Sequence, residues 1–253
     1  MELTNSIRKL VASLGAAKHR RQEGVFKAEG TKCVLDTLPH FKVRYLIATD
    51  EWLSVHDRVS DCGLVIAASH RDLERMSDLK CAPDVIAVYD IPEHSLDIQS
   101  LTGSLVLALD SVQDPGNLGT IIRTADWFGV RDIICSRTTA DLYNPKVVQA
   151  TMGAISRIRV HYTDLEQALT EASSLGMAVF GTLLDGEDIY ASPLSPSGIL
   201  VMGNEGNGLS EGVRRLVDHR LLIPSYPPSE PTSESLNVAI ATAICLSEFR
   251  RRL

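Results

Sequence analysis

The feature that most limits the fold is an alternation of short apolar segments with helical patterns through residues 105–253. The mostly apolar segments have the length of buried strands and lie at residues 105–109, 132–135, 157–161, 178–182 and 199–202. Helical periodicity marks residues 118–128, 145–152, 164–175, 210–216 and 236–252. Apolar strands that alternate with helices favour a parallel sheet covered on both faces. We therefore predict an α/β domain here.

The N-terminal part has the pattern of a second, smaller α/β unit. Ile7, Leu10, Val11 and Leu14 recur at helical spacing and predict an amphipathic helix over residues 3–22. Shorter strand and helix patterns follow at residues 25–29, 31–38, 43–48, 64–68, 71–79 and 85–89. A chain of 253 residues is long enough for two domains. We predict domains at residues 1–91 and 104–253, joined by a polar linker at residues 92–103.

The composition excludes several classes of protein. Hydrophobic residues make up 44% of the chain and charged residues 23%, which rules out global disorder, a collagen-like fibre and a membrane bundle. The start of the chain lacks a signal-peptide core and is typical of a mature protein. The five scattered cysteines form no C-x-x-C pair, and the histidines form no H-E-x-x-H motif. We therefore expect no disulfide framework, no metal and a reducing, cytoplasmic location.

The net charge of −7 excludes a strongly basic protein, yet the charge is unevenly distributed. Residues 1–45 hold nine Lys and Arg against four Asp and Glu, whereas residues 46–110 hold four against twelve. Salt screens distant charges over about 10 Å, so a basic cluster on an acidic protein can still bind phosphates. A solvated helix face would explain the cluster equally well. Its candidate phosphate contacts are Lys18, Arg20, Arg21 and Lys27.

Three junctions in the second half, each between a predicted strand and a loop, are rich in Gly, Asn and Glu. They match no dinucleotide-binding G-x-G-x-x-G motif, no phosphate-binding P-loop and no hydrolase G-x-S-x-G elbow. In the first junction, Asn117 follows a Pro-Gly turn. A role as a helix cap, with no further function, would be enough to explain it. Arg123 lies within the predicted helix, where capping does not require it. An Arg at that position could clamp a phosphate.

The second and third junctions carry the same kinds of residue. Glycines are dense from Gly203 to Gly208, which lets the backbone approach a ligand closely, although a flexible surface turn would look the same. The third junction runs from Ile223 through four prolines, which stiffen the loop. Ser235 or Asn237 then starts the last helix, and a capping role would also explain Ser235.

Taken together, the three junctions resemble the motifs of the SpoU family of RNA ribose 2′-O-methyltransferases, also called the TrmH family, within the SPOUT superfamily. The first motif, N-x-G-x-x-x-R-[TS]-A-x-x-F-G, is matched by Asn117, Gly119, Arg123, Thr124, Ala125, Phe128 and Gly129. The second, G-x-E-x-x-G-[LI], is matched by Gly203, Glu205, Gly208 and Leu209. The third is matched by Ile223, Pro224, Ser235, Leu236, Asn237 and Val238.

The resemblance covers about residues 105–253 and implies a parallel-sheet SPOUT domain with a trefoil knot that binds S-adenosylmethionine. It implies a homodimer whose knot regions form the interface, with Arg123 near or across it. It also implies cofactor contacts from Thr182, Leu183, Gly203, Ile223 and Leu236. The corresponding catalytic residues are Asn117, Arg123, Glu205, Ser235 and Asn237.

The reaction that the resemblance implies is methyl transfer to a ribose 2′-hydroxyl, a group that RNA has and DNA lacks. A guanidinium stays protonated in proteins. We therefore expect Arg123 to hold the phosphate beside the target ribose, with proton removal as a secondary role. Asn117 and Glu205 would orient Arg123 and the substrate, and Ser235 and Asn237 would complete the pocket.

The N-terminal part resembles, more weakly, the family's small α/β RNA-binding domain, which is similar to a ribosomal protein. The segment Phe26-Lys27-Ala28-Glu29-Gly30 is the usual opening of that domain. This favours rRNA as the substrate over tRNA. Two alternatives stay open, a non-catalytic RNA-binding protein that kept the fold and a small-molecule methyltransferase on the same scaffold.

The third motif departs from the family pattern. Most members have I-P-M-x-G before S-L-N, whereas here Ser225 replaces the Met, the Gly is missing and the loop is longer. We expect residues 225–233 to form a stiff lip over the cofactor site, because extra residues are tolerated best in an exposed loop.

Overall fold

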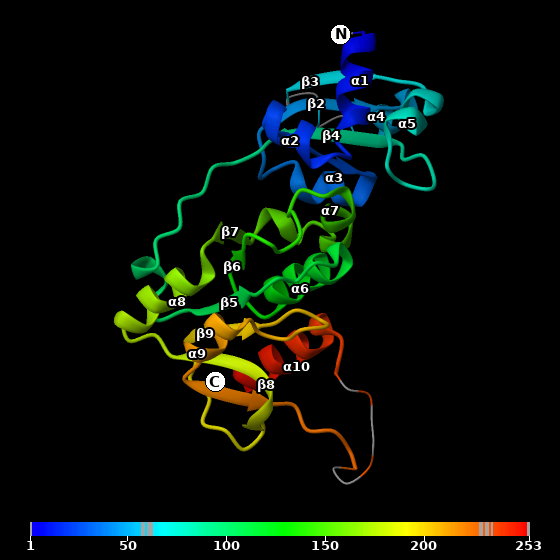
Figure 1. Cartoon of the computed structure of the whole chain (residues 1–253). Helices are drawn as coiled ribbons and strands as arrows, with labels where there is room; N and C mark the ends of the chain where they lie inside the picture. Colours follow the sequence, from blue (N-terminus) through cyan, green and yellow to red (C-terminus); the bar gives the residue numbers. More distant parts are fainter. Residues whose placement is uncertain are drawn as a thin grey trace. The chain divides into compact units, whose positions relative to one another are not determined.

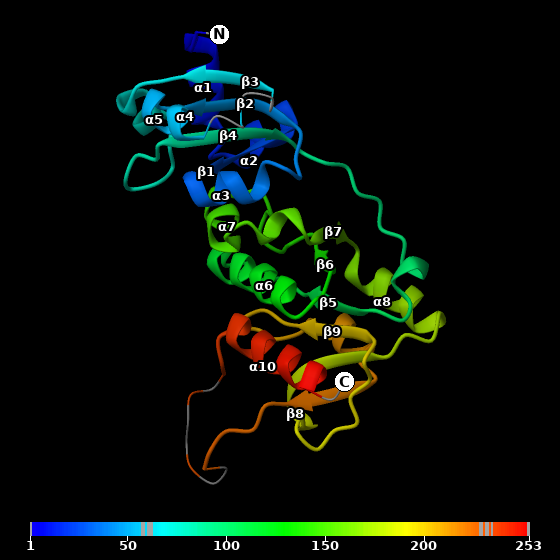
Figure 2. The ribbon, with the colours of Figure 1, turned by 180° about the vertical axis from the view of Figure 1, so that it is seen from behind.

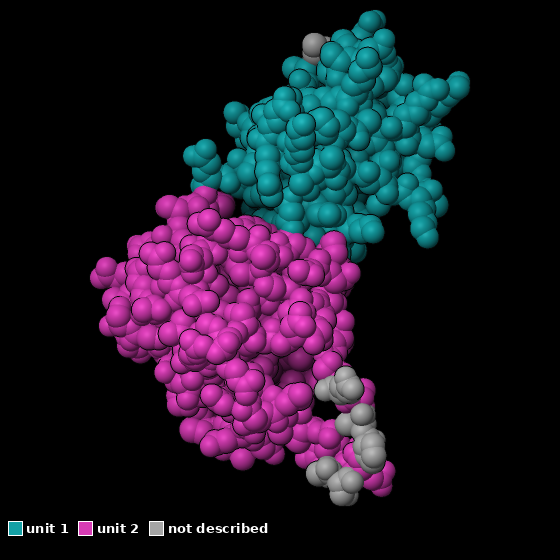
Figure 3. All heavy atoms as spheres, viewed as in Figure 1, with its two compact units in different colours: residues 1–93, 141–156 teal, residues 94–140, 157–253 magenta. Residues whose placement is uncertain are grey.

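The computed structural model describes residues 2–56, 59, 63–227, 230, 233 and 235–251. The chain divides into two compact units, which are coloured separately in Figure 3. The first unit consists of residues 1–93 and 141–156, and the second of residues 94–140 and 157–253. A segment from the second half of the sequence therefore belongs to the first unit. Within the described ranges, no helix combines the length and the apolar character that crossing a membrane requires.

The second unit is built on a six-stranded sheet whose described strands all pair in parallel. Their order is β10 (His219–Leu222), β8 (Val179–Asp188), β9 (Gly198–Met202), β5 (Leu105–Leu109), β6 (Asp132–Ser136) and β7 (Arg159–Thr163). The central strands β5 and β9 are buried along their whole length, as strands covered on both faces should be. The prediction of a parallel-sheet α/β domain is confirmed.

Helices cover the two faces of this sheet in pairs. One face packs against α8 (Leu165–Ser174) and α9 (Glu211–Arg215), whose buried side chains share a core with Val179 of β8. Successive side chains of a strand point to opposite faces. Phe180 therefore points the other way, where its ring packs edge-on against Phe249, with ring centroids 5.0 Å apart. Phe249 belongs to α10 (Val238–Arg251), which lies with α6 (Pro115–Trp127) on that face (Figures 1 and 2).

The first unit is built on a mixed four-stranded sheet. The strand order is β1 (Val25–Glu29), β4 (Val85–Asp90), β2 (Val43–Ala48) and β3 (Leu64–Ala67), and only β2 and β3 pair in parallel among the described strands. Its helices are α1 (Asn5–Ser13), α2 (Ala17–Glu23), α3 (Thr31–Thr37), α4 (Asp50–Val55), α5 (His70–Met76) and α7 (Pro145–Thr151). Apolar side chains of α1, α5 and the sheet form its core.

The helix expected over residues 3–22 is two helices, α1 and α2. The chain turns between them at Leu14 and Gly15, whose carbonyl oxygens accept hydrogen bonds of 2.7 and 2.8 Å from the Arg20 guanidinium. A side chain at Gly15 would meet the Asp78 carboxylate, since a Cβ there would lie 2.9 Å from its Oδ1. The Arg20 side chain thus bonds the turn between the two helices, a contact that the spacing of apolar residues does not report.

The segment of residues 141–156 packs within the first unit through polar and aromatic contacts. Arg20 forms an ion pair of 2.6 Å with Asp141. The rings of Phe26 and Tyr143 lie 4.6 Å apart between centroids. The helix α7 and the 3-10 helix η3 (Ala154–Ser156) follow along the chain. Both contacts are made to buried side chains of the N-terminal unit, Arg20 and Phe26. This segment therefore completes the core of that unit.

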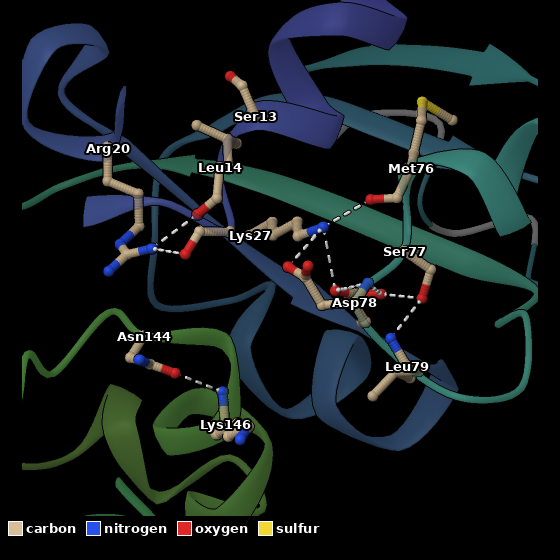
Figure 4. A network of polar contacts seen from close by, with 12 residues as sticks. Ser13, Leu14, Arg20, Lys27, Met76, Ser77, Asp78, Leu79, Asn144 and Lys146 are labelled. Atoms are coloured by element: carbon tan, nitrogen blue, oxygen red, sulfur yellow. Dashed lines mark hydrogen bonds and ion pairs between the residues drawn. The ribbon is translucent and has the colours of Figure 1, made fainter. Parts of the chain in front are cut away.

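The prediction of phosphate contacts needs a correction for Arg20 and Lys27. The exposed fraction of the Arg20 side chain is 2% and that of Lys27 is 1%. Lys27 Nζ lies 3.2 Å from Glu29 Oε1 and 3.0 Å from Asp78 Oδ2, and it donates to the Met76 carbonyl at 2.5 Å (Figure 4). The cationic groups of Arg20 and Lys27 are thus used inside the unit. Of the four candidates, Lys18 and Arg21 are exposed.

Replacement of Lys27 by Met should lower the free energy of unfolding by about 3–5 kcal/mol, because it leaves buried carboxylate charge without its cation. Denaturant unfolding followed by circular dichroism measures the change. The matched control is Lys32→Met, since the Lys32 side chain is 67% exposed and pairs with Asp36 across one helical turn. That change should cost less than about 0.5 kcal/mol. Equal stabilities of the two variants would contradict the role of Lys27 as the cation of a buried ion-pair cluster.

Candidate active site

The candidate site lies at the carboxyl edge of the parallel sheet in the second unit. Loops that follow β5, β8, β9 and β10 leave the sheet at this edge, because parallel strands end on the same side. The three motif segments lie in the loops after β5, β9 and β10 and in the helices that follow. The topology therefore gathers segments that lie far apart in the sequence, since 88 positions separate Asn117 from Glu205 and 120 separate it from Asn237.

The N-cap residue of α6 is Asp114, not Asn117. The Asp114 carboxylate caps the helix by accepting a hydrogen bond of 2.8 Å from the Asn117 backbone N–H, and Pro115 occupies the first turn. The alternative interpretation, in which Asn117 is only a helix cap, is therefore excluded. Its side-chain amide is free for other contacts because Asp114 satisfies the helix end.

The Asn117 side chain joins the three motifs by direct hydrogen bonds. Its Nδ2 donates to Glu205 Oε1 at 2.8 Å, and its Oδ1 accepts from Asn237 Nδ2 at 2.9 Å. The Asn237 side chain also caps α10, since its Oδ1 accepts from the backbone N–H of Ala239 at 2.9 Å. We call the connected side chains of Asn117, Glu205 and Asn237 the amide–carboxylate chain.

Two residues that the sequence analysis missed hold the Glu205 loop in place. Asn204 Nδ2 donates to the Ser111 carbonyl at 2.8 Å, and its Oδ1 accepts from the backbone N–H of Gly206 at 2.9 Å. The buried Asp110 carboxylate accepts from the Ser210 N–H at 2.7 Å. Asp110 directly follows an apolar strand, at the carboxyl edge of a predicted parallel sheet, where functional side chains commonly lie. This position was the sequence signal from which Asp110 could have been found.

Backbone geometry adds to the rigidity of this loop. Ser111, which accepts from Asn204, has a φ of 60°, a region that few residues other than glycine adopt. Gly203 lies so close to the returning chain that a Cβ would be 2.4 Å from the Gly208 carbonyl carbon. A side chain at position 203 would force the two arms of the loop apart. The close approach seen here is between the two arms of the loop, and the approach of this backbone to a ligand stays a prediction.

Arg123 is exposed on α6, six residues after Asn117. Its side chain forms no hydrogen bond or ion pair with the residues that the structure describes. Asn117 and Glu205 contact each other instead of orienting Arg123 directly. The guanidinium is therefore available to an external anion.

A cavity of about 810 Å³ lies beside the amide–carboxylate chain. All five predicted cofactor contacts line it, namely Thr182, Leu183, Gly203, Ile223 and Leu236. Glu205 and Ser235 line it as well, whereas Asn117, Arg123 and Asn237 do not. From the lengthened third motif, Ser225, Tyr226 and Ser233 line the cavity, and residues 228, 229, 231 and 232 lie outside the described ranges. Whether these residues bind a cofactor stays a prediction.

The cavity has the size and the lining that a nucleoside-containing cofactor requires. Small-molecule sites commonly enclose about 300–1,000 Å³ with mostly apolar walls and a few polar groups. Here the lining combines the apolar residues Leu183, Leu209 and Ile223 with residues of the Gly203 loop. In the described part of the chain, no three His, Cys, Asp or Glu side chains gather as a metal site would require.

Comparison with known proteins identifies the family. A model described as the SpoU rRNA Methylase family matches residues 104–247. The chain belongs to the SpoU rRNA methylase family. A second model, described as an MRM3-like substrate binding domain, matches residues 5–87.

Individual relatives resemble the SpoU chain over nearly its whole length. The 23S rRNA (guanosine(2553)-2'-O)-methyltransferase RlmP of Bacillus subtilis is 32% identical over 94% of this chain and 93% of its own. A solved structure of an RNA methyltransferase of the TrmH family from Porphyromonas gingivalis has a TM-score of 0.90 and 39% identity, and covers 99% of both chains. An AdoMet-bound rRNA methyltransferase from Sinorhizobium meliloti has a TM-score of 0.87 and 32% identity, and covers 100% of this chain and 98% of that one.

The amide–carboxylate chain predicts a pH-dependent effect of Asn117→Asp. The new carboxylate would face that of Glu205 and replace an amide donor, which should lower the free energy of unfolding by about 1–3 kcal/mol near pH 7. Repulsion between carboxylates raises their pKa values, so the deficit should shrink as the pH falls and the pair takes up a proton. Denaturant unfolding at several pH values measures this.

Asn144→Asp is the matched control for that change. Asn144 caps α7 by accepting from the Lys146 N–H, and Asp caps a helix about as well. The control should therefore leave stability nearly unchanged at neutral pH. A deficit for Asn117→Asp that stays constant or grows in acid would contradict the contact with Glu205.

Proposed function

We propose that this chain transfers a methyl group from S-adenosylmethionine to a ribose 2′-hydroxyl of rRNA. The observation that carries the proposal is the amide–carboxylate chain, which joins all three family motifs beside a cavity of cofactor size. The rRNA methylase family match and relatives named as 23S rRNA 2'-O-methyltransferases support the same reaction. These relatives do not favour tRNA as the substrate. Retention of the motif side chains argues against a non-catalytic role.

The chemistry divides between the cofactor and the side chains. When bound, S-adenosylmethionine supplies an activated methyl group. The residues that would hold it in the cavity are Thr182, Leu183, Gly203, Ile223 and Leu236. The reaction requires that the 2′-oxygen lie in line with that methyl group and that the hydroxyl lose its proton.

The residues outside the cavity position the RNA. Arg123 binds the phosphate next to the target ribose, which fixes the hydroxyl at the mouth of the cavity. Asn117 and Asn237 keep the Glu205 carboxylate at that mouth, and Ser235 supplies a hydroxyl there. Proton removal by Arg123 is a secondary role, because a guanidinium is a poor base.

Replacement of Arg123 by Ala should lower methyl transfer to rRNA below about a tenth of the wild-type rate, because a charged contact to phosphate contributes about 1.5–3 kcal/mol. Binding of S-adenosylmethionine, measured by calorimetry, should persist, since Arg123 does not line the cavity. The control is Arg131→Ala, in which a half-exposed Arg that pairs with Asp126 is removed. A variant at position 123 with more than a tenth of the turnover would refute the central role of Arg123.

The first unit supplies non-specific affinity for RNA. Its match to a substrate binding domain and the exposed side chains of Lys18 and Arg21 support this role. We assign residues 1–91 to RNA binding, residues 92–103 to a linker that contains the 3-10 helix η2 (Gln99–Leu101), and residues 104–253 to methyl transfer. We also assign the trefoil knot to the last of these, on the basis of family membership. An rRNA substrate makes the cytoplasm the expected location.

Neutralisation of Lys18 and Arg21 by Gln should reduce the salt dependence of RNA affinity. Each lost phosphate contact lowers the slope of log K against log salt by about 0.7–0.9, so two contacts correspond to about 1.4–1.8. Fluorescence anisotropy at several salt concentrations measures the slope. Arg215→Gln, at an exposed position in the second unit, should not change it. An unchanged slope for the double variant would mean that these residues do not contact RNA and only form a solvated helix face.

The chain forms a homodimer through α6 and α10, which pack against each other on one face of the sheet. Large apolar side chains are exposed there, with Trp127 86% and Ile240 53% accessible. A second copy of the chain would cover them and would bring Arg123 near the interface. Exposed apolar side chains on neighbouring helices are typical of an interface.

Ile240→Glu should convert the dimer into monomers, because it places a charge in an apolar contact. Sedimentation velocity at micromolar concentration measures the mass in solution. The control is Val55→Glu in the first unit, where Val55 is 75% exposed outside the proposed interface. A monomeric wild type, or a dimer that survives Ile240→Glu, would contradict this interface.

A further inference from the structure

Asp185 and Arg214, which line the cavity, form a charged cluster with Arg220, which does not line it. Arg214 of α9 lies 2.6 Å from Asp185 Oδ2, and Arg220 of β10 lies 2.8 Å from the same oxygen. All three side chains are about half exposed. Partial burial acts to raise the pKa of Asp185, but the charges of Arg214 and Arg220 outweigh it and hold the pKa below its ordinary value. One carboxylate thus serves two guanidiniums, which leaves the cluster with excess positive charge.

Arg214 differs from its basic neighbours in its relation to the cavity. Among the described residues that line the cavity, Arg214 is the one cationic side chain, and Asp185 and Glu205 are the anionic ones. Glu205 is held by Asn117 at the transfer end of the site. Arg220 and Arg215 do not line the cavity, and Arg215 pairs with Glu211 on the outer surface.

The cofactor carries one anionic group, the carboxylate of its methionine part. A carboxylate that leaves water for a partly enclosed site needs a cation or several donors, because an unpaired charge is costly to bury. A guanidinium has five N–H donors in a planar fork that matches a carboxylate. Arg214 uses one terminal nitrogen on Asp185, so other donors of its fork are available.

We propose that Arg214 binds the carboxylate of the methionine part of the cofactor and that Asp185 positions the Arg214 guanidinium for this contact. The inference rests on the proposed function, since it assigns a specificity-determining residue to the same cavity. Arg220 holds the shared Asp185 oxygen from the other side. Asp185 therefore stays in place when Arg214 turns part of its fork toward the ligand.

The test compares two ligands that differ in the carboxylate alone, S-adenosylhomocysteine and its decarboxylated analogue S-adenosyl-3-thiopropylamine. Calorimetry on the full-length protein gives both dissociation constants without any turnover. Wild type should bind S-adenosylhomocysteine about tenfold to a hundredfold more tightly than the analogue, as expected for a hydrogen bond between charged groups. Arg214→Gln should abolish this preference and leave affinity for the analogue unchanged within about twofold.

Arg215→Gln is the matched control, because it removes the same charge one position along the same helix, on the outer surface. It should keep the wild-type preference. The inference is overturned if Arg214→Gln keeps the preference for S-adenosylhomocysteine. It is also overturned if the substitution weakens binding of both ligands equally, since Arg214 would then shape the cavity without contacting the carboxylate.

The binding data distinguish failure of the Arg214 role from failure of the proposed function. A wild type that binds both ligands equally would overturn the role of Arg214 and leave the proposed function standing. A wild type that binds neither ligand would remove the proposed function and, with it, this inference. Arg214→Lys separates charge from geometry, and it should retain part of the preference because Lys keeps the charge and loses the fork.

Discussion

The hydrogen bonds of the Asn117 side chain are the contacts on which the rest of the site depends. They join residues 88 and 120 positions apart in the sequence, at 2.8 and 2.9 Å. An amide can do this because it both donates and accepts, so it bridges a carboxylate on one side and another amide on the other. Asp114 makes the bridge available by capping α6 in place of Asn117.

Much of this arrangement could be predicted from the sequence. Strands buried on both faces are continuous apolar runs, so β5 and β9 were found nearly to the residue. The three motifs identified Asn117, Glu205 and Asn237, which the structure brings into contact. Asp110 and Asn204 were missed although Asp110 follows a predicted buried strand, because their long-range hydrogen bonds go to the backbone of Ser210 and Ser111, about 100 and 93 positions away, and local periodicity does not report such contacts.

The basic cluster near the N-terminus shows why charge counts are weak evidence on their own. Lys18 and Arg21, three positions apart, share the exposed face of α2, whereas Arg20 points inward. Lys27 lies on β1, a strand that is buried at every position. Its ammonium is neutralised by carboxylates from two segments. A residue's charge constrains its partners, and only the fold decides whether those partners are solvent, ligand or protein.

The placement of residues 141–156 in the first unit has a consequence for synthesis of the chain. Domains that are continuous in sequence can fold in order as they leave the ribosome. Here Asp141 and Tyr143 reach Arg20 and Phe26 only after β5 and β6 of the other sheet have been made. The N-terminal unit therefore cannot complete its folding until the ribosome has also synthesised the first strands of the second unit.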